Sequence, residues 1–353
     1  MKPVTIYDIA KEANVSVATV SRVLNNTAPV RKSTRDRIVE IMNKHQFQPN
    51  ALARSLLKKE TGMLGVLLPD ITNPFFPEVL SGLDQAARSK GYTYFLCDTF
   101  SSNEDHIDQY TRESQYLSIL IEKQVDGIIM IGGRINLNRV SAEMVGEVVE
   151  VSKRVPVVMI NGHLPGTSIH RVNADERAGA EMAVQHLIDL GHRDIAFIGG
   201  YKQMSNTNMR MQSYVRTMTA NGIRVDERKI RLGGFNVDQG KSLMEELLGL
   251  PERPTAVFCA NDMVAIGAIK AARKAGLHIP DDLSIIGFDD VPTASSFIPE
   301  LTTVSLKSRL LGQTGADVLH GLIMKSKMKK VTVIQPELIV RESTGPVKVA
   351  SRL

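Results

Sequence analysis

Apolar residues in the first part of the chain recur with the period of short helices. Three such helices are predicted, with starts at Thr5, Ser16 and Ser33, and residues 17–24 form the second. Thr5 and Ser33 each open a capping box with an aspartate three residues later. Asn14-Val15 separates the first two helices by a tight turn, which predicts a helix-turn-helix. The positions expected to be buried are Ile6, Ile9, Ala10, Ala13, Val20, Val23, Leu24, Ile38, Ile41 and Met42.

From Met63 onward, apolar residues instead form short continuous runs that alternate with helical stretches. Continuous runs are typical of strands buried on both faces, and this alternation predicts parallel α/β sheets. About 280 residues are too many for one compact core of this kind, so two lobes are expected. The clearest helices are residues 76–90, 177–190 and 263–274, each closed by a glycine. The expected strands are Met63–Pro69, Tyr92–Cys97, Gly127–Ile131, Pro156–Ile160, Ile195–Gly199, Ala256–Cys259 and Leu283–Phe288.

Composition favours a cytoplasmic protein that does not enter a membrane. The chain has 353 residues and two cysteines, Cys97 and Cys259, with neither CxxC nor metal-binding spacing. We expect both to be buried reduced thiols, and we expect no metal or other cofactor. Charged residues interrupt the first apolar positions, so no signal peptide is predicted, and no run approaches the roughly 18 apolar residues of a membrane helix.

Positive charge is concentrated at the beginning of the chain. Residues 1–60 contain eleven Lys or Arg and five Asp or Glu, a net +6, whereas the whole chain carries +5. The remaining residues therefore sum to about −1. This distribution favours contact with nucleic acid, although a solvated basic surface has the same composition.

The second predicted helix carries side chains that could read DNA. Its buried stripe leaves Val17, Ala18, Ser21 and Arg22 facing outward. Small apolar side chains can touch thymine methyl groups, and Arg22 can donate two hydrogen bonds to guanine O6 and N7. The alternative is a plain three-helix bundle with an exposed arginine. The candidate phosphate contacts are Thr5, Tyr7, Ser16, Thr19 and Asn25.

Polar residues collect directly after the predicted strands. Ligands bind at the carboxyl ends of strands in such folds, and carboxylates, amides, an arginine and an aromatic ring suit a polyhydroxylated ligand. For any single residue, a turn or helix-cap role is a strong alternative. We prefer that alternative for Asp262 and Asp290, and a structural role for His192. The candidate effector-binding residues are Phe75, Asp98, Asn161, Arg210, Asn261 and Asp289.

The run KPVTIYDIAKEANVSVATVSRVLN, followed by QPNALARSL, resembles the head and hinge of the lactose/galactose-repressor family. The resemblance covers essentially the whole chain, because PDITNPFF, LGHRDIAFIGG, CANDMVAIGAI and LSIIGFDD follow in the family's order. It implies that the second helix enters the major groove. It also implies that paired hinge helices, with Asn50 and Ala53, enter the minor groove and that Leu56 wedges into the central base step. The resemblance favours binding over capping for Asn161, Arg210, Asn261 and Asp289.

The resemblance thus implies an α-helical helix-turn-helix head joined to a two-lobed α/β sensor domain like the periplasmic binding proteins. It implies a repressor that binds a pseudo-palindromic operator as a homodimer and responds to a sugar-like effector, which either releases or strengthens DNA binding. A protein co-repressor is a further partner of some members. The short polar tail has no leucine heptads, which favours a dimer over a tetramer.

The expected bounds are residues 1–46 for the head, 47–61 for a hinge helix of marginal stability, 62–341 for the sensor and 342–353 for the tail. Lobe 1 is expected at 62–161 and 292–323, and lobe 2 at 162–291 and 324–341. Two positions depart from the family: Phe47 replaces a tyrosine of some members, and Leu306 replaces a polar ligand-binding side chain of some sugar-responsive members.

Two other classes of protein fit less well. An enzyme with these sheets would need a motif such as GxGxxG, GxxxxGK[ST] or GxSxG, and the sheet segments contain none. A periplasmic sugar-binding protein would share the two lobes, but it has no use for residues 1–60. Salt-dependent binding to a palindromic duplex would separate the three classes.

Overall fold

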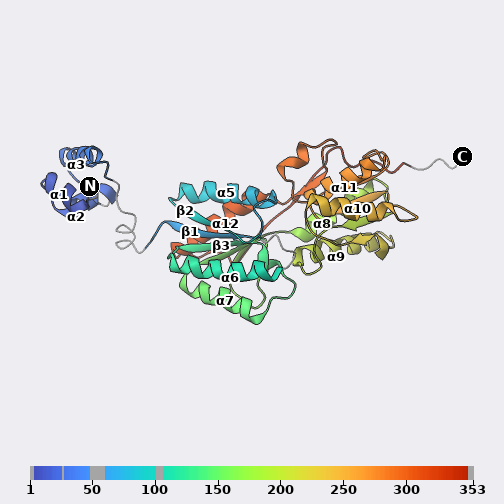
Figure 1. Cartoon of the computed structure of the whole chain (residues 1–353), viewed down its shortest axis with the longest axis horizontal. Helices are drawn as coiled ribbons and strands as arrows, with labels where there is room; N and C mark the ends of the chain where they lie inside the picture. Colours follow the sequence, from blue (N-terminus) through green and yellow to red (C-terminus); the bar gives the residue numbers. More distant parts are fainter. Residues whose placement is uncertain (1–3, 26–27, 48–59, 101–105, 349–353) are drawn as a thin grey trace. The chain divides into compact units, whose positions relative to one another are not determined.

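The computed structural model describes residues 4–25, 28–47, 60–100 and 106–348. The chain divides between Gly62 and Met63 into two compact units, each of which is described by itself (Figure 1). The hinge residues Asn50, Ala53 and Leu56 lie outside the described residues. The described part of the first unit contains α1 (Ile6–Glu12), α2 (Val17–Asn25) and α3 (Lys32–Lys44).

Local hydrogen bonds explain where the helices of the head begin. The Thr5 hydroxyl accepts the Asp8 N–H at 3.4 Å, and the Asp8 carboxylate accepts the Thr5 N–H at 2.8 Å, which confirms the first capping box. The Ser16 hydroxyl accepts the Thr19 N–H at 3.2 Å at the start of α2. The capping box expected at Ser33 is wrong: the N-cap is Arg31, two residues earlier, so the Ser33 hydroxyl lies inside the first turn instead of ahead of its free N–H groups.

One apolar cluster holds these three helices together. Its most buried side chains are those of Ile9, Val20 and Ile38, each with no exposed surface. Ile6, Leu24 and Met42, which the periodicity predicts to be buried, are only partly buried against this cluster. Burial of a stripe from each helix is the main source of stability for helices as short as α1 and α2.

The second unit contains two parallel sheets, as the alternating pattern predicts. The six-stranded sheet of lobe 1 has the order β11-β5-β4-β3-β1-β2, and the four-stranded sheet of lobe 2 has the order β7-β6-β8-β9. A two-stranded antiparallel sheet, β10 with β12, adjoins lobe 2, because isolated bridges join Thr302 to Ile286 and Ser305 to Asp289. The strands are β1 Met63–Leu68, β2 Thr93–Asp98, β3 Gly127–Ile131, β4 Val157–Ile160, β5 His170–Ala174, β6 Ile195–Ile198, β7 Ile230–Arg231, β8 Ala256–Cys259, β9 Ser284–Ile286, β10 Thr303–Ser305, β11 Val331–Ile334 and β12 Glu337–Ile339.

Helices cover both faces of each sheet. In lobe 1, α5 and α12 pack on one face and α6 and α7 on the other (Figure 1). In lobe 2, α8 and α9 pack on one face and α10 and α11 on the other. The bounds are α5 Phe75–Ser89, α6 His106–Glu122, α7 Ala142–Arg154, α8 Glu176–Asp189, α9 Ser205–Ala220, α10 Val237–Leu248, α11 Asp262–Lys274 and α12 Ser308–Ile323, with short 3₁₀ turns η1 Gly133–Asn136, η2 Glu227–Lys229 and η3 Pro292–Ser295. Glycines 91, 191 and 276 follow α5, α8 and α11 with positive φ, as expected.

The chain crosses between the lobes at other places than expected. The predicted crossings near Gly162 and Met324 are wrong, because β5 and β11 are both strands of the lobe 1 sheet. The first crossing therefore follows β5, just before α8, and the last follows β11. The predicted crossing near Val291 also comes later, because Thr302 still bridges to Ile286 of lobe 2 before α12 packs on α5 of lobe 1.

Two strands of lobe 1, β2 and β5, differ from the sequence expectation. β2 is an edge strand, so Phe95 and Leu96 are 40% and 41% exposed instead of buried on both faces. Strand β5 does not appear in the apolar pattern because its sequence, HRVNA, is not an apolar run.

The polar segment expected as a tail packs against lobe 2. Ser343 is fully buried, its carbonyl accepts the N–H of Ile285 in β9, and its hydroxyl donates to the carbonyl of Ile285.

Within the described residues, no helix combines the length and apolar character needed to cross a membrane. The same residues contain no cluster of three or more His, Cys, Asp or Glu side chains with the geometry of a metal site. Cys97 and Cys259 are buried free thiols, as expected.

Candidate functional site

The side chains expected on the outer surface of α2 differ in how far they are exposed. Ala18 and Arg22 are exposed, and Arg22 makes no ion pair with any described residue. Ser21 and Thr19 are partly buried, and Val17 packs partly against the core of the head, so the outward face of α2 is narrower than predicted. Of the remaining candidates, Thr5, Ser16 and Tyr7 are exposed, Tyr7 at 70%, and the side chain of Asn25 is not described.

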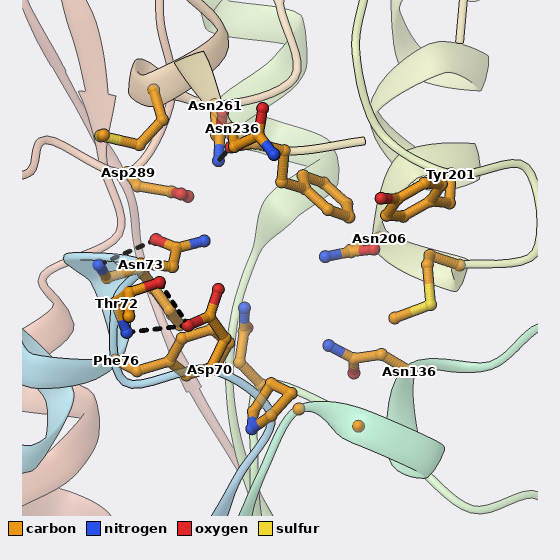
Figure 2. A pocket seen from close by; sticks show the side chains of 18 of the residues that line it. Asp70, Thr72, Asn73, Phe76, Asn136, Tyr201, Asn206, Asn236, Asn261 and Asp289 are labelled. Carbon is orange, nitrogen blue, oxygen red and sulfur yellow. Dashed lines mark hydrogen bonds between the residues drawn. The ribbon is translucent and has the colours of Figure 1, made fainter. Parts of the chain in front are cut away.

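A cavity of about 440 Å³ lies between the two lobes of the second unit, at the carboxyl ends of their strands (Figure 2). Both lobes contribute to its wall: Asp70 and Asn136 come from lobe 1, and Tyr201 and Asn236 from lobe 2. Five of the six candidate effector-binding residues line this cavity: Phe75, Asn161, Arg210, Asn261 and Asp289. A volume of this size is within the range of small-molecule sites.

Arg210 is the centre of a buried ion cluster in the wall of the cavity. Its Nε and Nη2 donate to the two carboxylate oxygens of Glu176 at 2.9 and 3.0 Å, and Nη2 also contacts Asp289 Oδ1 at 3.4 Å. Nη1 donates to the carbonyl of Ala260, and the guanidinium carbon lies 4.1 Å from the ring centre of Phe288. The pairing explains how this cation can be almost completely buried.

Asp289 is a buried carboxylate in the wall of the cavity. Burial raises the pKa of Asp289 to about 7, although the adjacent Arg210 opposes this shift, and Glu176 raises it further. Its backbone has a φ of 105°, a strained value for a residue other than glycine. Among the described residues, its one side-chain hydrogen-bond partner is Arg210, so an oxygen remains available to a ligand in the cavity.

Two lining amides are also held by the protein. Asn161, which has a left-handed backbone with φ of 53°, donates to Glu176 at 2.7 Å and accepts the Ala174 N–H at 3.1 Å. Asn261 caps α11 by accepting the Val264 N–H at 2.9 Å, and it donates to the Phe235 carbonyl at 3.0 Å. The capping alternative therefore applies to Asn261 even though it lines the cavity.

Comparisons with known proteins agree with this arrangement over the whole chain. Residues 5–50 match the family model "Bacterial regulatory proteins, lacI family", and residues 184–344 match "Periplasmic binding protein-like domain". The chain is 37% identical over 346 residues to the transcriptional regulator DegA of Bacillus subtilis, with 97% of this chain and 98% of DegA covered. The chain belongs to the LacI family. It is a DNA-binding transcription regulator with a ligand-binding domain, and not an enzyme.

Other members of the LacI family support the same assignment. The transcriptional repressor CytR of Escherichia coli is 33% identical over 344 residues, with 96% of each chain covered. The solved structure of a lac repressor dimer bound to operator and the anti-inducer ONPF has a TM-score of 0.85 and 27% identity, and the match covers 98% of this chain and 100% of the repressor.

In this LacI-family chain, Asp98 does not reach the cavity, which corrects the sixth candidate. Its carboxylate accepts the N–H groups of Phe100 at 3.0 Å and Ile71 at 3.5 Å. These bonds tie the end of β2 to the loop after β1. Asp98 therefore supports the cavity wall from behind, because Phe100 and the loop residues Asp70 and Thr72 do line the cavity.

The loop after β1 is a large part of the site that single-residue reasoning missed. Asp70 accepts the Thr72 N–H at 2.8 Å and the Thr72 hydroxyl at 2.6 Å, while Asn73 accepts the Phe75 N–H at 3.2 Å. Figure 2 shows Asp70, Asn73 and Phe76 on the lobe 1 side of the space that they share with Asp289. The motif PDITNPFF, which directly follows β1, contains all of these lobe 1 residues and is the sequence signal for this part of the site.

Pairs of glycines mark the other missed segments of the wall. Gly132-Gly133, Gly199-Gly200 and Gly233-Gly234 follow β3, β6 and β7, and five of these six glycines have positive φ. Such turns let the chain reverse at the end of a strand and bring the next polar residues into the cavity. The lining side chains that follow these pairs include Asn136, Tyr201, Asn206 and Asn236.

Arg134 directly follows the first glycine pair, and its buried side chain ties the turn after β3 to helices α6 and α7. The side chain has no exposed surface; Nε donates to Glu113 at 2.9 Å, and Nη1 donates to Glu147 at 2.6 Å. Nη2 donates to the carbonyl of Tyr110 at 3.0 Å and to the hydroxyl of Ser114 at 2.8 Å. Nothing in the sequence pattern distinguished this buried arginine from a surface one.

Asp262, Asp290 and His192, for which the sequence favours structural roles, all have partners inside the protein. The buried Asp262 accepts the Thr303 hydroxyl at 2.5 Å and the Val291 N–H at 2.8 Å, and burial raises its pKa well above the ordinary value. Asp290 pairs with Arg341 at 2.7 Å. The buried His192 contacts the hydroxyls of Thr255 and Ser284, each at 3.0 Å.

Proposed function

We propose that this LacI-family regulator is a repressor that binds a pseudo-palindromic operator as a homodimer and responds to a sugar-like effector. The observation that carries the proposal is the exposed pair Ala18 and Arg22 on α2, joined in one chain to a lined cavity between two lobes. Ala18 would touch a thymine methyl group, and Arg22 would donate two hydrogen bonds to a guanine. The residues proposed to hold phosphates are Thr5, Tyr7, Ser16, Thr19 and Asn25, and the partly buried Ser21 and Val17 are proposed as partial contacts of the base-reading face.

The wall of the cavity supports an effector with several hydroxyl groups. Asp289 and Asp70 can each accept hydrogen bonds from hydroxyls, and the amides of Asn73 and Asn236 can both donate and accept. The ring of Phe76 offers an apolar face for the C–H groups of a sugar. Because Arg210 is already paired with Glu176 and Asp289, its role is to orient these acceptors and to donate through its remaining N–H group.

Control of DNA binding follows from the position of the cavity between two lobes. A ligand that contacts both lobes favours one arrangement of them, and it shifts the balance only by its differential affinity for the two arrangements. We propose that this balance reaches the hinge, where Asn50 and Ala53 would contact the minor groove and Leu56 would wedge between base pairs. An inducer would disfavour the hinge helix, and a small-molecule co-repressor would favour it.

The remaining partners and the site of action follow from this role. The regulator would act in the cytoplasm, where the chromosome of a bacterium is accessible. A protein co-repressor is an alternative second input, and no described residue favours it over the small molecule.

Selection of duplexes from a random pool by the purified full-length chain tests the proposal. We expect enriched sequences with two-fold symmetry, two chains bound per duplex, and an affinity that falls steeply as salt rises. The matched control is a scrambled duplex of the same length and composition. Enrichment without symmetry, or equal affinity for the selected and scrambled duplexes, would mean that the chain does not read an operator as a dimer.

A further inference from the structure

The segment between α12 and β11 is unusually basic. Residues 324–330 include Lys325, Lys327, Lys329 and Lys330, and all four are exposed. None of them forms an ion pair with a described residue, and Lys330 instead donates to the carbonyl of Ser168 at 2.8 Å. Lysines elsewhere in lobe 1 do find partners, for example Lys90 with Asp317 at 2.5 Å. These four charges are therefore not neutralised locally.

Two neighbouring segments add to this charge because of the topology of the lobe. Each segment that leads from a helix into a parallel strand lies at the amino end of that strand. Residues 122–126 connect α6 to β3, residues 150–156 end α7 and lead into β4, and residues 324–330 lead into β11. Together they form what we call the end face. Its basic residues are Lys123, Lys153, Arg154, Lys325, Lys327, Lys329 and Lys330, and its acidic residues are Glu122, Asp126 and Glu150.

The end face thus carries seven basic and three acidic side chains, a net charge of +4. The net charge of all residues after position 60 is about −1. The end face is therefore much more positive than the rest of the second unit. The cavity lies at the opposite, carboxyl ends of the strands, so the end face is separate from the effector site. A concentrated positive surface of this kind attracts a polyanion.

The same end of lobe 1 receives the chain that comes from the DNA-binding head. Strand β1 starts there at Met63, and its carbonyl accepts the N–H of Asp126, a residue of the end face, at 2.7 Å. In the sheet order, β11 is four strand spacings from β1, and the register sets Val331, the first residue of β11, level with Leu67, so the segment before β11 lies on the order of 20 Å from Met63 across the sheet. The linker between residue 47 and residue 60 therefore enters the second unit at its basic end.

We propose that the end face binds phosphates of the DNA that flanks the operator. The inference rests on the proposed function, because the head must first bring the chain to its site. Lysine ammonium groups bind phosphate as point charges and release counterions, without reading sequence. A short tether gives the end face a high effective concentration near the bound DNA. The contact would strengthen binding to long DNA and leave recognition of the operator bases unchanged.

The test compares two charge-removing triple variants of the full chain on two duplexes. K325Q/K327Q/K329Q removes three charges from the end face, and the control R224Q/R253Q/K270Q removes three exposed charges from lobe 2. One duplex ends at the operator, and the other carries about 15 further base pairs on each side. On the long duplex, we expect the end-face variant alone to bind more weakly, with a slope of log affinity against log salt shallower by about 2 to 3. On the short duplex, all three proteins should bind equally.

Equal binding of the wild type and the end-face variant to the long duplex would overturn the proposal and leave operator recognition intact. A loss of equal size on both duplexes would also overturn it, because the lysines would then act within the operator complex. Failure of the wild type to prefer the short operator over a scrambled duplex would instead contradict the proposed function. K325R/K327R/K329R should restore wild-type binding if charge alone matters.

Discussion

Arg210 and Glu176 form a two-pronged ion pair, with Nε to Oε2 at 2.9 Å and Nη2 to Oε1 at 3.0 Å. The same Glu176 oxygen that accepts from Nη2 also accepts the amide of Asn161 at 2.7 Å. Glu176 is not part of the cavity wall, but it holds two residues that are. A planar guanidinium paired at both prongs has one orientation, so the position of Arg210 in the wall is fixed before a ligand arrives.

Glu176→Gln should therefore weaken effector binding, although residue 176 does not line the cavity and makes no direct contact with the effector. A glutamine side chain has one acceptor oxygen, so only one of the two hydrogen bonds from Nε and Nη2 of Arg210 can be kept. The negative charge beside the guanidinium is also lost. We expect effector affinity to fall by about tenfold or more, and the free energy of unfolding by about 1–3 kcal/mol. Calorimetric titration and thermal unfolding measure the two effects.

The control for that experiment is Glu181→Gln, on the same helix. Glu181 pairs with Arg216 on the surface, where an ion pair contributes little. Its effector affinity should match the wild type. If Glu176→Gln also matches the wild type, the ion pair does not position the site.

Effector binding should depend on pH because of Asp289. The pKa of this buried carboxyl is about 7, and ligand hydroxyls donate best to its ionised form. Affinity should therefore rise with pH up to about 7 and then level off, with release of a proton on binding below that pH. Titrations in buffers of different ionisation enthalpy measure the proton. An affinity that is constant from pH 6 to 8, with no proton released, would contradict this role.

Stability should show the opposite trend with pH. The pKa of Asp289 in the folded protein lies above its ordinary value of 3.8, so the folded state holds the proton more tightly than the unfolded state. The contribution of Asp289 to stability is therefore full below about pH 4 and is lost as pH rises to about 7. Asp289→Asn removes this dependence, so its melting temperature relative to wild type should increase between pH 5 and 8.

Recognition of bases should depend on the guanidinium of Arg22. Arg22→Ala should cost roughly 1–3 kcal/mol on the selected operator and relax the preference for one guanine in each half-site. Arg22→Lys keeps the charge but loses the two-pronged geometry, so it should retain affinity for scrambled DNA and lose the preference. Affinities for operators varied at each position give the answer. An equal loss on scrambled DNA for Arg22→Ala would reduce this residue to a phosphate contact.

The sequence predicted the features that depend on apolar spacing or on local capping. The helices of the head, the parallel sheets and the cap at Thr5 follow from neighbours a few residues apart. The same information placed Arg210, Asn261 and Asp289 at strand ends, where the cavity lies. Local reasoning was wrong at Ser33, because α3 begins at Lys32 with Arg31 as an N-cap that makes no side-chain cap hydrogen bond.

Features that depend on distant pairings could not be predicted. Strand β5 follows β4 without a helix between them, and its partner β11 lies more than 150 residues later, so both were placed in the wrong lobe. Glu176 and Arg134 have the sequence signature of surface charges, and only the fold shows their buried partners. Asp98 follows a strand as the lining residues do, but at that strand end it binds backbone N–H groups of the loops instead.

A ligand in the cavity is expected to control the affinity of the head for its operator. The most direct test titrates the selected operator with wild type and Arg210→Ala, each with and without a sugar that binds the wild type by calorimetry. Without the sugar, both proteins should bind the operator equally. With the sugar, the affinity of the wild type should change by tenfold or more, downward for an inducer or upward for a co-repressor, and the affinity of Arg210→Ala should not change. An equal change in both proteins, or no change in the wild type at saturating sugar, would contradict the account.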